Sequence, residues 1–482
     1  MILKKQAISG VKWSGFARGS QQILQFIITV ILARLLMPED FGILSMAVVF
    51  TGLITVFNDF GIGSAVIQKQ NLTDDDLSSI FWFSLFIGIV TTLLTVIVSP
   101  LIAAFYDKKI LIPLLSIMAF GFFFTGFSTV QQSLLIKEMN FKKIAVVEIT
   151  STVFGGIVAI SLAYWGYGVW SLVWQGLSAT IITALLLWLT SQWRPKFKLY
   201  LTSIKLVLGF SLNLLGFNTV NYFSRNVDYL FIGRFLGAEP LGYYTLAYRL
   251  MLYPLQNISA VISRVLFPAF SAIQDDNERF RDAYLKSTRY IAFVTFPMMF
   301  GLFAVADEFI LTIFGPKWDP TIFLLKVLCF IGMLQSIGTT VGQIYLAKGK
   351  TDWMFKWGLF STIITIFAIL VGLRWGLKGV AVAYALRTLI LSYPGYAIPF
   401  NLIGLKVKNL IHNLKKEFVV SLIMFVFVLS SVFVQRRIGI ESEVLLVSNV
   451  LLGITIYTLA TIKLNSEVFK EICGIVWNKK EF

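Results

Sequence analysis

Runs of roughly twenty or more mainly apolar residues recur along this chain, each long enough to cross the ~30 Å hydrocarbon core of a bilayer as a helix. Helices and closed barrels are the structures that satisfy their own backbone hydrogen bonds in lipid. The chain has 482 residues, of which 57% are hydrophobic and 14% are charged, and a soluble core cannot bury that much apolar surface. The sequence therefore predicts an all-α polytopic membrane protein.

We expect about fourteen transmembrane helices from these runs. The predicted spans are 13–36, 41–66, 80–105, 110–136, 144–164, 168–190, 206–236, 241–270, 288–314, 320–347, 354–374, 378–404, 417–435 and 443–463. The even number places both termini on one side. Most Lys and Arg residues fall in the loops of that side, so the positive-inside rule predicts cytoplasmic termini in the cell membrane. The residues after Leu464 favour an amphipathic helix on the inner face, or a frayed tail.

Several classes of function are disfavoured by composition. One histidine, His412, and two cysteines, Cys329 and Cys473, form no metal, disulfide or histidine-based catalytic pattern. We therefore expect neither a metal nor a cofactor. The formal net charge of +16 is attributed to cytoplasmic loops and anionic lipids, so membrane lipids and not nucleic acid are the expected partners.

Two segments 200 residues apart are alike: ARLLMPEDFG at 33–42 and GRFLGAEPLG at 233–242. Further matches follow in order, such as QxxLxK at 132–137 and again at 343–348. The repeat divides the chain into an N-lobe (1–200), a C-lobe (201–405), and two additional helices with a tail (406–482). Both halves begin in the cytoplasm, so the repeat is parallel and its pseudo-two-fold axis runs along the membrane normal.

Each half opens with a helix that carries a polar stripe at helical spacing. The stripes comprise Arg18, Gln21, Gln22 and Gln25 in the first half and Asn218, Asn221, Tyr222 and Arg225 in the second. We interpret both stripes as the lining of a water-filled central cavity. Hydrogen bonding between helices, or snorkelling of Arg18 to the inner surface, is the alternative.

Three further charged residues lie on the seventh and eighth spans. Asp228 and Arg249 lie at similar depth on either side of the turn near Ala238, so Asp228 pairs with Arg249 or, at i and i+3, with Arg225. Arg264 lies nearer the cytoplasmic end, as a cavity residue or an interfacial anchor. Guanidinium groups match phosphate oxygens bidentately, so the arginine excess favours an anionic ligand.

Carboxylates within spans are candidates for binding Na⁺ or carrying protons: Asp59, Glu148 and Asp228. For Asp59 and Glu148, hydration at the inner interface is the alternative explanation. Lys326 and Arg387 are further cavity candidates.

The chain resembles the oligosaccharidyl-lipid flippases of the multidrug/oligosaccharidyl-lipid/polysaccharide exporter superfamily. The motifs that carry the resemblance are LARLLxPxDFG at 32–42, DFGIG at 59–63, NxD at 226–228, GRFLG at 233–237, GYY at 242–244 and FPA at 267–269. The resemblance implies a MATE-like fold with twelve core helices in two lobes, often with two extra C-terminal helices, and an alternating-access cycle.

The resemblance also implies a substrate, an undecaprenyl-diphosphate-linked oligosaccharide moved from the cytoplasmic to the outer leaflet for cell-surface polysaccharide biosynthesis. Coupling to Na⁺ or protons is expected, and polysaccharide polymerase machinery is a further candidate partner. In this hypothesis Arg18, Arg225, Arg249 and Arg264 bind the pyrophosphate. Gln21, Gln25, Asn218, Asn221 and Tyr222 contact the sugars.

Three other functions compete with this one. A drug/cation antiporter of the same superfamily shares the fold, but acids rather than arginines are expected to dominate its cavity. A peptidoglycan-precursor flippase would also carry a pyrophosphate-linked substrate, so the arginine excess does not distinguish it. A membrane-embedded enzyme is disfavoured because the outer loops are short and the single histidine lies on the inner side.

Overall fold

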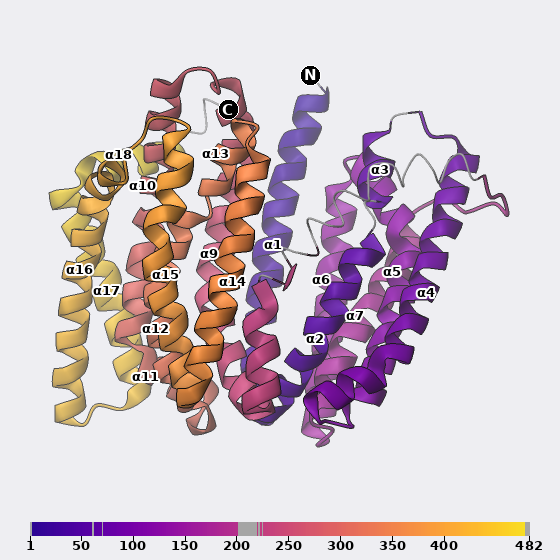
Figure 1. Ribbon diagram of the computed structural model, residues 1–482, viewed down its shortest axis with the longest axis horizontal. Coiled ribbons are helices and arrows are strands. Elements are labelled where there is room, and N and C mark those ends of the chain that lie inside the picture. The colour runs from indigo at the N-terminus through magenta and orange to yellow at the C-terminus, as the bar shows by residue number, and fades with distance from the viewer. Residues whose placement is uncertain are drawn as a thin grey trace. The chain divides into compact units, whose positions relative to one another are not determined.

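The computed structural model describes residues 2–59, 62–69, 71–200, 219, 222–223 and 225–477. All regular secondary structure in these residues is helical (Figure 1), which confirms the predicted all-α class. The chain divides into two compact units, Met1–Gly242 and Tyr243–Phe482. The division into lobes at residues 200 and 405, which rests on the repeat, stays a prediction.

The first unit is a bundle of long helices (Figure 1). They are α1 (Ile2–Leu35), α2 (Pro38–Asp59), α3 (Ile62–Gln68), α4 (Asp74–Tyr106), α5 (Leu111–Lys137), α6 (Phe141–Tyr164), α7 (Val169–Thr190) and a helix at 225–236. The closest packing joins α4 to α5, α6 to α7, and α1 to α6.

Local sequence sets several helix ends in this unit. Thr73 and Asp76 form a capping box at the start of α4, in which the Thr73 hydroxyl accepts from the Asp76 backbone N–H at 3.2 Å. The loop after α7 lies against α4, where Lys198 Nζ donates to Asp75 Oδ2 at 2.7 Å. This hydrogen bond raises the pKa of the Lys198 ammonium group.

The second unit contains the remaining helices. They are most of α9 (Ala238–Ala272), α10 (Asn277–Ala304), α11 (Ala306–Phe309), the π-turn η1 (Ile310–Phe314), η2 (Pro316–Trp318), α12 (Pro320–Gly338), α13 (Val341–Ala347), α14 (Thr351–Gly372), η3 (Leu373–Trp375), α15 (Gly376–Asn401), α16 (Val407–Ile438), α17 (Ser442–Leu464) and α18 (Ser466–Trp477). After Leu464, Ser466–Trp477 is therefore helical.

Two of the predicted spans are not continuous helices. The span 320–347 divides between α12 and α13, whereas 41–66 includes residues 60–61, outside the described residues. The span 288–314 bends by 77° after Ala304. Beyond the bend, Asp307 forms salt bridges with Lys326 and Arg436.

Ten helical stretches in the described residues are long and apolar enough to cross a membrane, or eleven with the bent pair. One of the ten stretches, Thr351–Asn401, contains both α14 and α15. The predicted span 206–236 lies partly outside the described residues, so the total of fourteen stays a prediction. The protein is a multi-pass membrane protein.

A buried ionic network fastens the last helices to α10. Arg289 of α10 donates through Nε to Glu417 Oε1 of α16 at 2.8 Å and through Nη2 to Asn465 Oδ1 at 2.8 Å. Asn465 Nδ2 also donates to Glu417 Oε1, and the Glu417 side chain is fully buried. The Tyr290 hydroxyl of α10 donates to Glu471 of α18, which lowers the pKa of that carboxyl group.

Candidate functional site

The two repeat segments found in the sequence pack directly against one another in the first unit. A Cβ placed on Gly42 would lie 1.7 Å from the carbonyl oxygen of Ala238, and one on Gly242 would lie 1.9 Å from that of Pro38. The contact is reciprocal, because residues 38 and 42 of one segment correspond to 238 and 242 of the other. This is the geometry that a two-fold relation between repeats produces.

Neighbouring side chains surround this contact. Lys108 Nζ forms a salt bridge with Glu39 Oε1 at 2.8 Å, and the Arg234 guanidinium lies 5.7 Å from the ring centroid of Phe105. The Asp40 carboxylate accepts from the backbone N–H of Met37 at 2.9 Å, which caps α2. Both motif arginines that follow an apolar run, Arg34 and Arg234, thus belong to a tightly packed end of the unit rather than to a free loop.

The α1 helix, which carries the first polar stripe, packs along α6, a neighbour that the sequence pattern did not predict. Arg18 is exposed, Gln21 and Gln25 are half-buried, and α1 packs along α6. The Arg18 guanidinium acts electrostatically on the Glu148 carboxyl group of α6. The predicted cavity residue Arg18 and the predicted coupling residue Glu148 are therefore neighbours.

Tyr222 is held against the backbone of α2. Its hydroxyl lies 2.8 Å from the carbonyl oxygen of Val49 and 3.2 Å from that of Val48, and donates to this pair. A Cβ on Gly52 would lie 2.3 Å from the same hydroxyl, so the glycine makes room for it. The hydroxyl proton is committed to α2, which leaves the ring and the oxygen lone pairs for a ligand.

The helix at 225–236 carries two of the predicted charges in different environments. Arg225 is exposed, whereas Asp228 is only 4% exposed and its Oδ1 accepts from the Tyr229 backbone N–H at 3.0 Å. A carboxylate this deeply buried in a membrane span is typical of a functional or paired group. The particular pairings predicted for Asp228 stay predictions.

In the second unit Arg249 of α9 is half-buried. Among the described residues of their own units, no carboxylate forms an ion pair with Arg18, Arg225 or Arg249. The remaining predicted site residues lie outside the described residues or side chains: Asp59, Asn218, Asn221 and Arg264. Among the described residues, no group of three or more His, Cys, Asp or Glu side chains is arranged to hold a metal ion.

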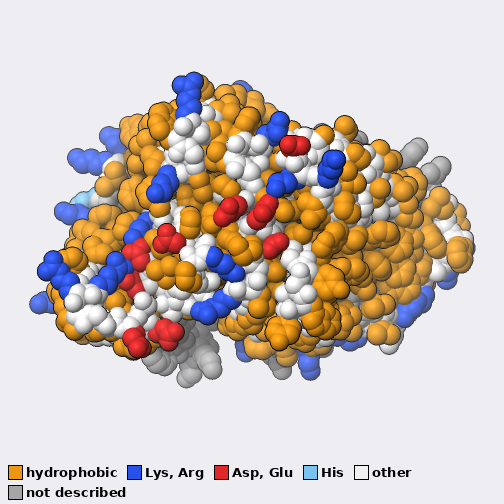
Figure 2. Space-filling view, turned by 90° about the horizontal axis from the view of Figure 1, so that it is seen from below, with side chains coloured by type: hydrophobic (Ala, Val, Ile, Leu, Met, Phe, Trp, Pro, Cys, Tyr) orange, Lys and Arg blue, Asp and Glu red, His pale blue; other side chains and the backbone are white. Residues whose placement is uncertain are grey.

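Sequence reasoning missed a charged cluster at the bend after α10. Asp307 Oδ1 lies 2.6 Å from Lys326 Nζ, and Asp307 Oδ2 lies 2.6 Å from Arg436 Nη2. Arg436 Nε also donates to Glu308 Oε1 at 2.6 Å. These residues line a cavity of about 640 Å³. Figure 2, which views the molecule from this end of the helices, shows acidic and basic side chains mixed, with hydrophobic side chains around them.

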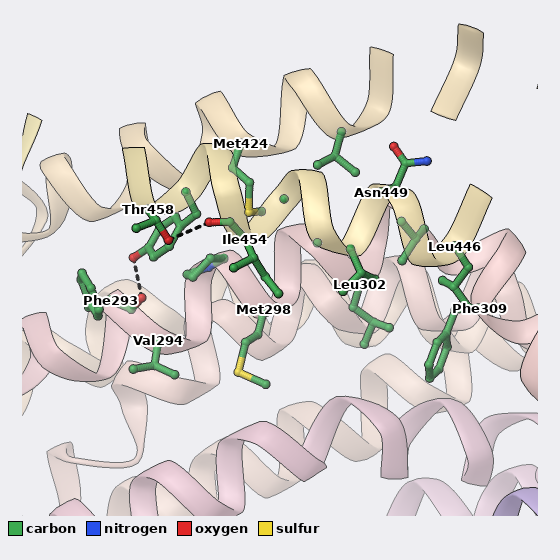
Figure 3. A pocket seen from close by; sticks show the side chains of 17 residues that line it. Phe293, Val294, Met298, Leu302, Phe309, Met424, Leu446, Asn449, Ile454 and Thr458 are labelled. Carbon is green, nitrogen blue, oxygen red and sulfur yellow. Dashed lines mark hydrogen bonds between the residues drawn. The ribbon is translucent and has the colours of Figure 1, made fainter. Parts of the chain in front are cut away.

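A second cavity, of about 440 Å³, lies between α10, α16 and α17 (Figure 3). Its lining is mainly apolar and includes Met298, Leu302 and Ile454. The Asn449 amide at one end donates to Gln435 Oε1 at 2.8 Å. The cavity has no charged lining residue, so it contributes nothing to anion binding.

A family model described as "Polysaccharide biosynthesis protein" matches residues 31–323, more than half of the chain. The chain belongs to this family. Within the polysaccharide biosynthesis family it is similar to the lipopolysaccharide biosynthesis protein WzxC of Escherichia coli (strain K12), with 29% identity over 91% of this chain and 89% of the relative. It is also 28% identical to the teichuronic acid biosynthesis protein TuaB of Bacillus subtilis (strain 168), over 96% of each chain.

Solved structures confirm the fold expected from the resemblance. The lipid II flippase MurJ in an inward closed conformation matches with a TM-score of 0.76 and 19% identity, over 95% of this chain and 100% of that structure. An inward-facing multidrug resistance MATE family transporter of the MOP superfamily matches with a TM-score of 0.63 and 17% identity, over 80% and 94%. This member of the polysaccharide biosynthesis family therefore shares the fold of these two structures.

Proposed function

We propose that this protein translocates a lipid-diphosphate-linked oligosaccharide, carried on undecaprenol, from the cytoplasmic to the outer leaflet of the cell membrane. It does so by alternating access, with both termini in the cytoplasm, and it supplies cell-surface polysaccharide biosynthesis. The proposal is supported by membership of the polysaccharide biosynthesis family and by near full-length similarity to WzxC and TuaB.

The observation that carries the substrate class is the state of the arginines on the membrane helices. Arg18, Arg225 and Arg249 have no ion-pair partner among the described residues of their own units. A diphosphate cannot cross bare hydrocarbon, because an isolated buried charge is strongly disfavoured. Unpaired guanidinium groups provide both the charge and the forked donors that phosphate oxygens require.

The residue roles follow the sequence-based hypothesis. Arg18, Arg225, Arg249 and Arg264 are the proposed pyrophosphate ligands. The proposed sugar contacts are Gln21, Gln25, Asn218, Asn221 and Tyr222. Buried carboxyl groups such as Asp228 are the proposed coupling sites for Na⁺ or protons.

The test is surface glycan in a host that depends on this protein. Arg225→Ala and Arg249→Ala are each expected to reduce surface glycan at least tenfold at normal expression, because a charge-assisted bond to phosphate contributes about 1.5–3 kcal/mol. Arg374→Ala is the matched control, since Arg374 is exposed in η3. Full surface glycan in both cavity variants would refute the assigned site.

A further inference from the structure

A third pocket, of about 190 Å³, contains one charged side chain, the guanidinium of Arg387. Arg387 lies on α15, which packs against α12 and α14 in the second unit (Figure 1). Gln335 of α12, Ser361 of α14 and Ser392 of α15 also line the pocket. The volume is below the ~300–1,000 Å³ of pockets for drug-sized ligands, so the pocket accommodates a small group rather than a whole oligosaccharide.

The hydrogen bonds of Arg387 leave part of its guanidinium group without a partner. Nη2 donates to the Ser361 carbonyl oxygen at 3.0 Å and also to the Ser361 hydroxyl. Nε is buried and has no hydrogen-bond partner among the described residues. No carboxylate in the described part of the chain neutralises the charge, since the electrostatic neighbours of Arg387 are the hydroxyls of Tyr384 and Tyr248.

Two hydroxyl groups that line the pocket have already committed their protons. The Tyr396 hydroxyl donates to the Leu334 carbonyl oxygen at 3.0 Å, and the Ser392 hydroxyl donates to that of Leu389 at 2.7 Å. The pocket therefore offers one unused cationic donor and no anion. This combination favours an oxyanion over a neutral or cationic ligand.

The hydrogen bonds that join α15 to α14 at Ser361 do not require a charged side chain at position 387. A neutral glutamine at position 387 keeps amide donors for the Ser361 oxygens and avoids placing an uncompensated cation in the membrane. An arginine at such a position is typical of a substrate or ion site.

The depth of Arg387 in the membrane excludes resting phospholipid headgroups as the source of the oxyanion. Arg387 is 11 residues from the start of α15 and 14 from its end, or about 16 and 21 Å along the helix at ~1.5 Å per residue. It therefore lies near the middle of a ~30 Å core, far from the headgroups of phospholipids at rest. An oxyanion reaches it while crossing the membrane.

We propose that the Arg387 pocket is a phosphate-binding station for the substrate in transit, in addition to Arg225 and Arg249; this rests on the proposed function. The Arg387 guanidinium, which lines the pocket, donates to a phosphate oxygen of the diphosphate while Nη2 stays bonded to Ser361. The ligand chemistry is a phosphate-type oxyanion, either the diphosphate of the lipid carrier or free pyrophosphate.

The test measures binding of inorganic pyrophosphate to the purified full chain in nanodiscs of neutral phosphatidylcholine. It uses the Arg225→Ala/Arg249→Ala background, which removes the other proposed ligands. We expect saturable binding at constant ionic strength. Arg387→Gln should weaken it at least tenfold, Arg387→Lys less so, and Arg374→Gln, an exposed control with the same charge change, should not affect it. Equal affinity in the Arg387→Gln and Arg374→Gln proteins would overturn the proposal.

Ser392→Leu provides a second route if Arg387→Gln fails to fold. This change fills the pocket and leaves the Arg387–Ser361 bonds intact, so it should also abolish pyrophosphate binding; unchanged binding would overturn the proposal.

A parallel arm embeds polyprenyl diphosphate in the nanodisc. Loss of binding in both arms assigns the carrier diphosphate, and loss with free pyrophosphate alone assigns a small-anion site. Binding needs no turnover, so these results remain separate from failure of the flippase assay.

Discussion

At the scale of single residues, the glycines of the repeat carry the contact between its two copies. Gly42 and Gly242 each occupy a position where a Cβ would overlap a backbone carbonyl oxygen of the other copy. A backbone atom cannot rotate away as a flexible side chain can. We expect Gly42→Ala to destabilise the protein by about 1–3 kcal/mol, the typical cost of overpacking, in thermal unfolding of the detergent-solubilised chain.

Gly121→Ala is the control for that experiment. Gly121 lies inside α5 with nothing within 4 Å of the Cβ position, so alanine there should be neutral or stabilise by about 0.5–1 kcal/mol through helix propensity. If Gly42→Ala and Gly121→Ala unfold alike, the reciprocal packing described above is wrong.

Two of the three candidate coupling carboxylates, Asp228 and Glu148, differ in environment, and this difference predicts different phenotypes. Asp228 is buried, and Asn at this position keeps an acceptor for the Tyr229 N–H, whereas Glu148 is half-buried beside Arg18. We expect Asp228→Asn to reduce transport more than Glu148→Gln. The measurement is the transport rate as a function of Na⁺ concentration and pH. Equal, negligible effects would remove both residues from consideration.

At the scale of helices, the Arg289–Glu417–Asn465 network holds α16 and α17 to α10. Glu417→Gln leaves Arg289 without its buried counter-charge, which costs up to about 3–5 kcal/mol. We expect earlier thermal unfolding and faster proteolysis of the loop before α16. Lys286→Gln, which removes the exposed Lys286–Glu471 pair, should cost about 0–1 kcal/mol. Similar small effects of both changes would contradict a docking role for the buried pair.

Apolar runs predicted most of the helices because span length is set locally by the thickness of the bilayer. The breaks were not predictable in the same way. The bend after Ala304 is accompanied by contacts of Asp307 with Lys326 and Arg436, the second of which lies more than 100 residues away in sequence. The sequence contained one signal of these contacts, namely acidic and basic residues at the same ends of different predicted spans.

The candidate site was also predictable only in part, because contacts between helices could not be read from the sequence pattern. Helical spacing placed Arg18 and Gln21 on one stripe, but it did not identify Glu148, 130 residues later, as the electrostatic neighbour of Arg18. The spacing also placed Tyr222 in a cavity without showing that its hydroxyl bonds to α2. Periodicity locates side chains on one helix, whereas their partners depend on how helices pack.

At the scale of the whole molecule, the repeated segments and the charges of the membrane helices support the proposed function. The two similar segments, 33–42 and 233–242, pack reciprocally at Gly42 and Gly242. The membrane helices carry arginines that lack ion-pair partners among the described residues of their own units. A transporter fold with these charges suits a lipid-linked anion.

The most direct test measures lipid-linked oligosaccharide in each leaflet of a host that lacks this protein. The account predicts that the intermediates accumulate in the cytoplasmic leaflet, and that the wild-type protein clears them whereas Arg225→Ala does not. Normal surface glycan, together with altered tolerance to cationic dyes, would contradict the account and support a drug antiporter instead.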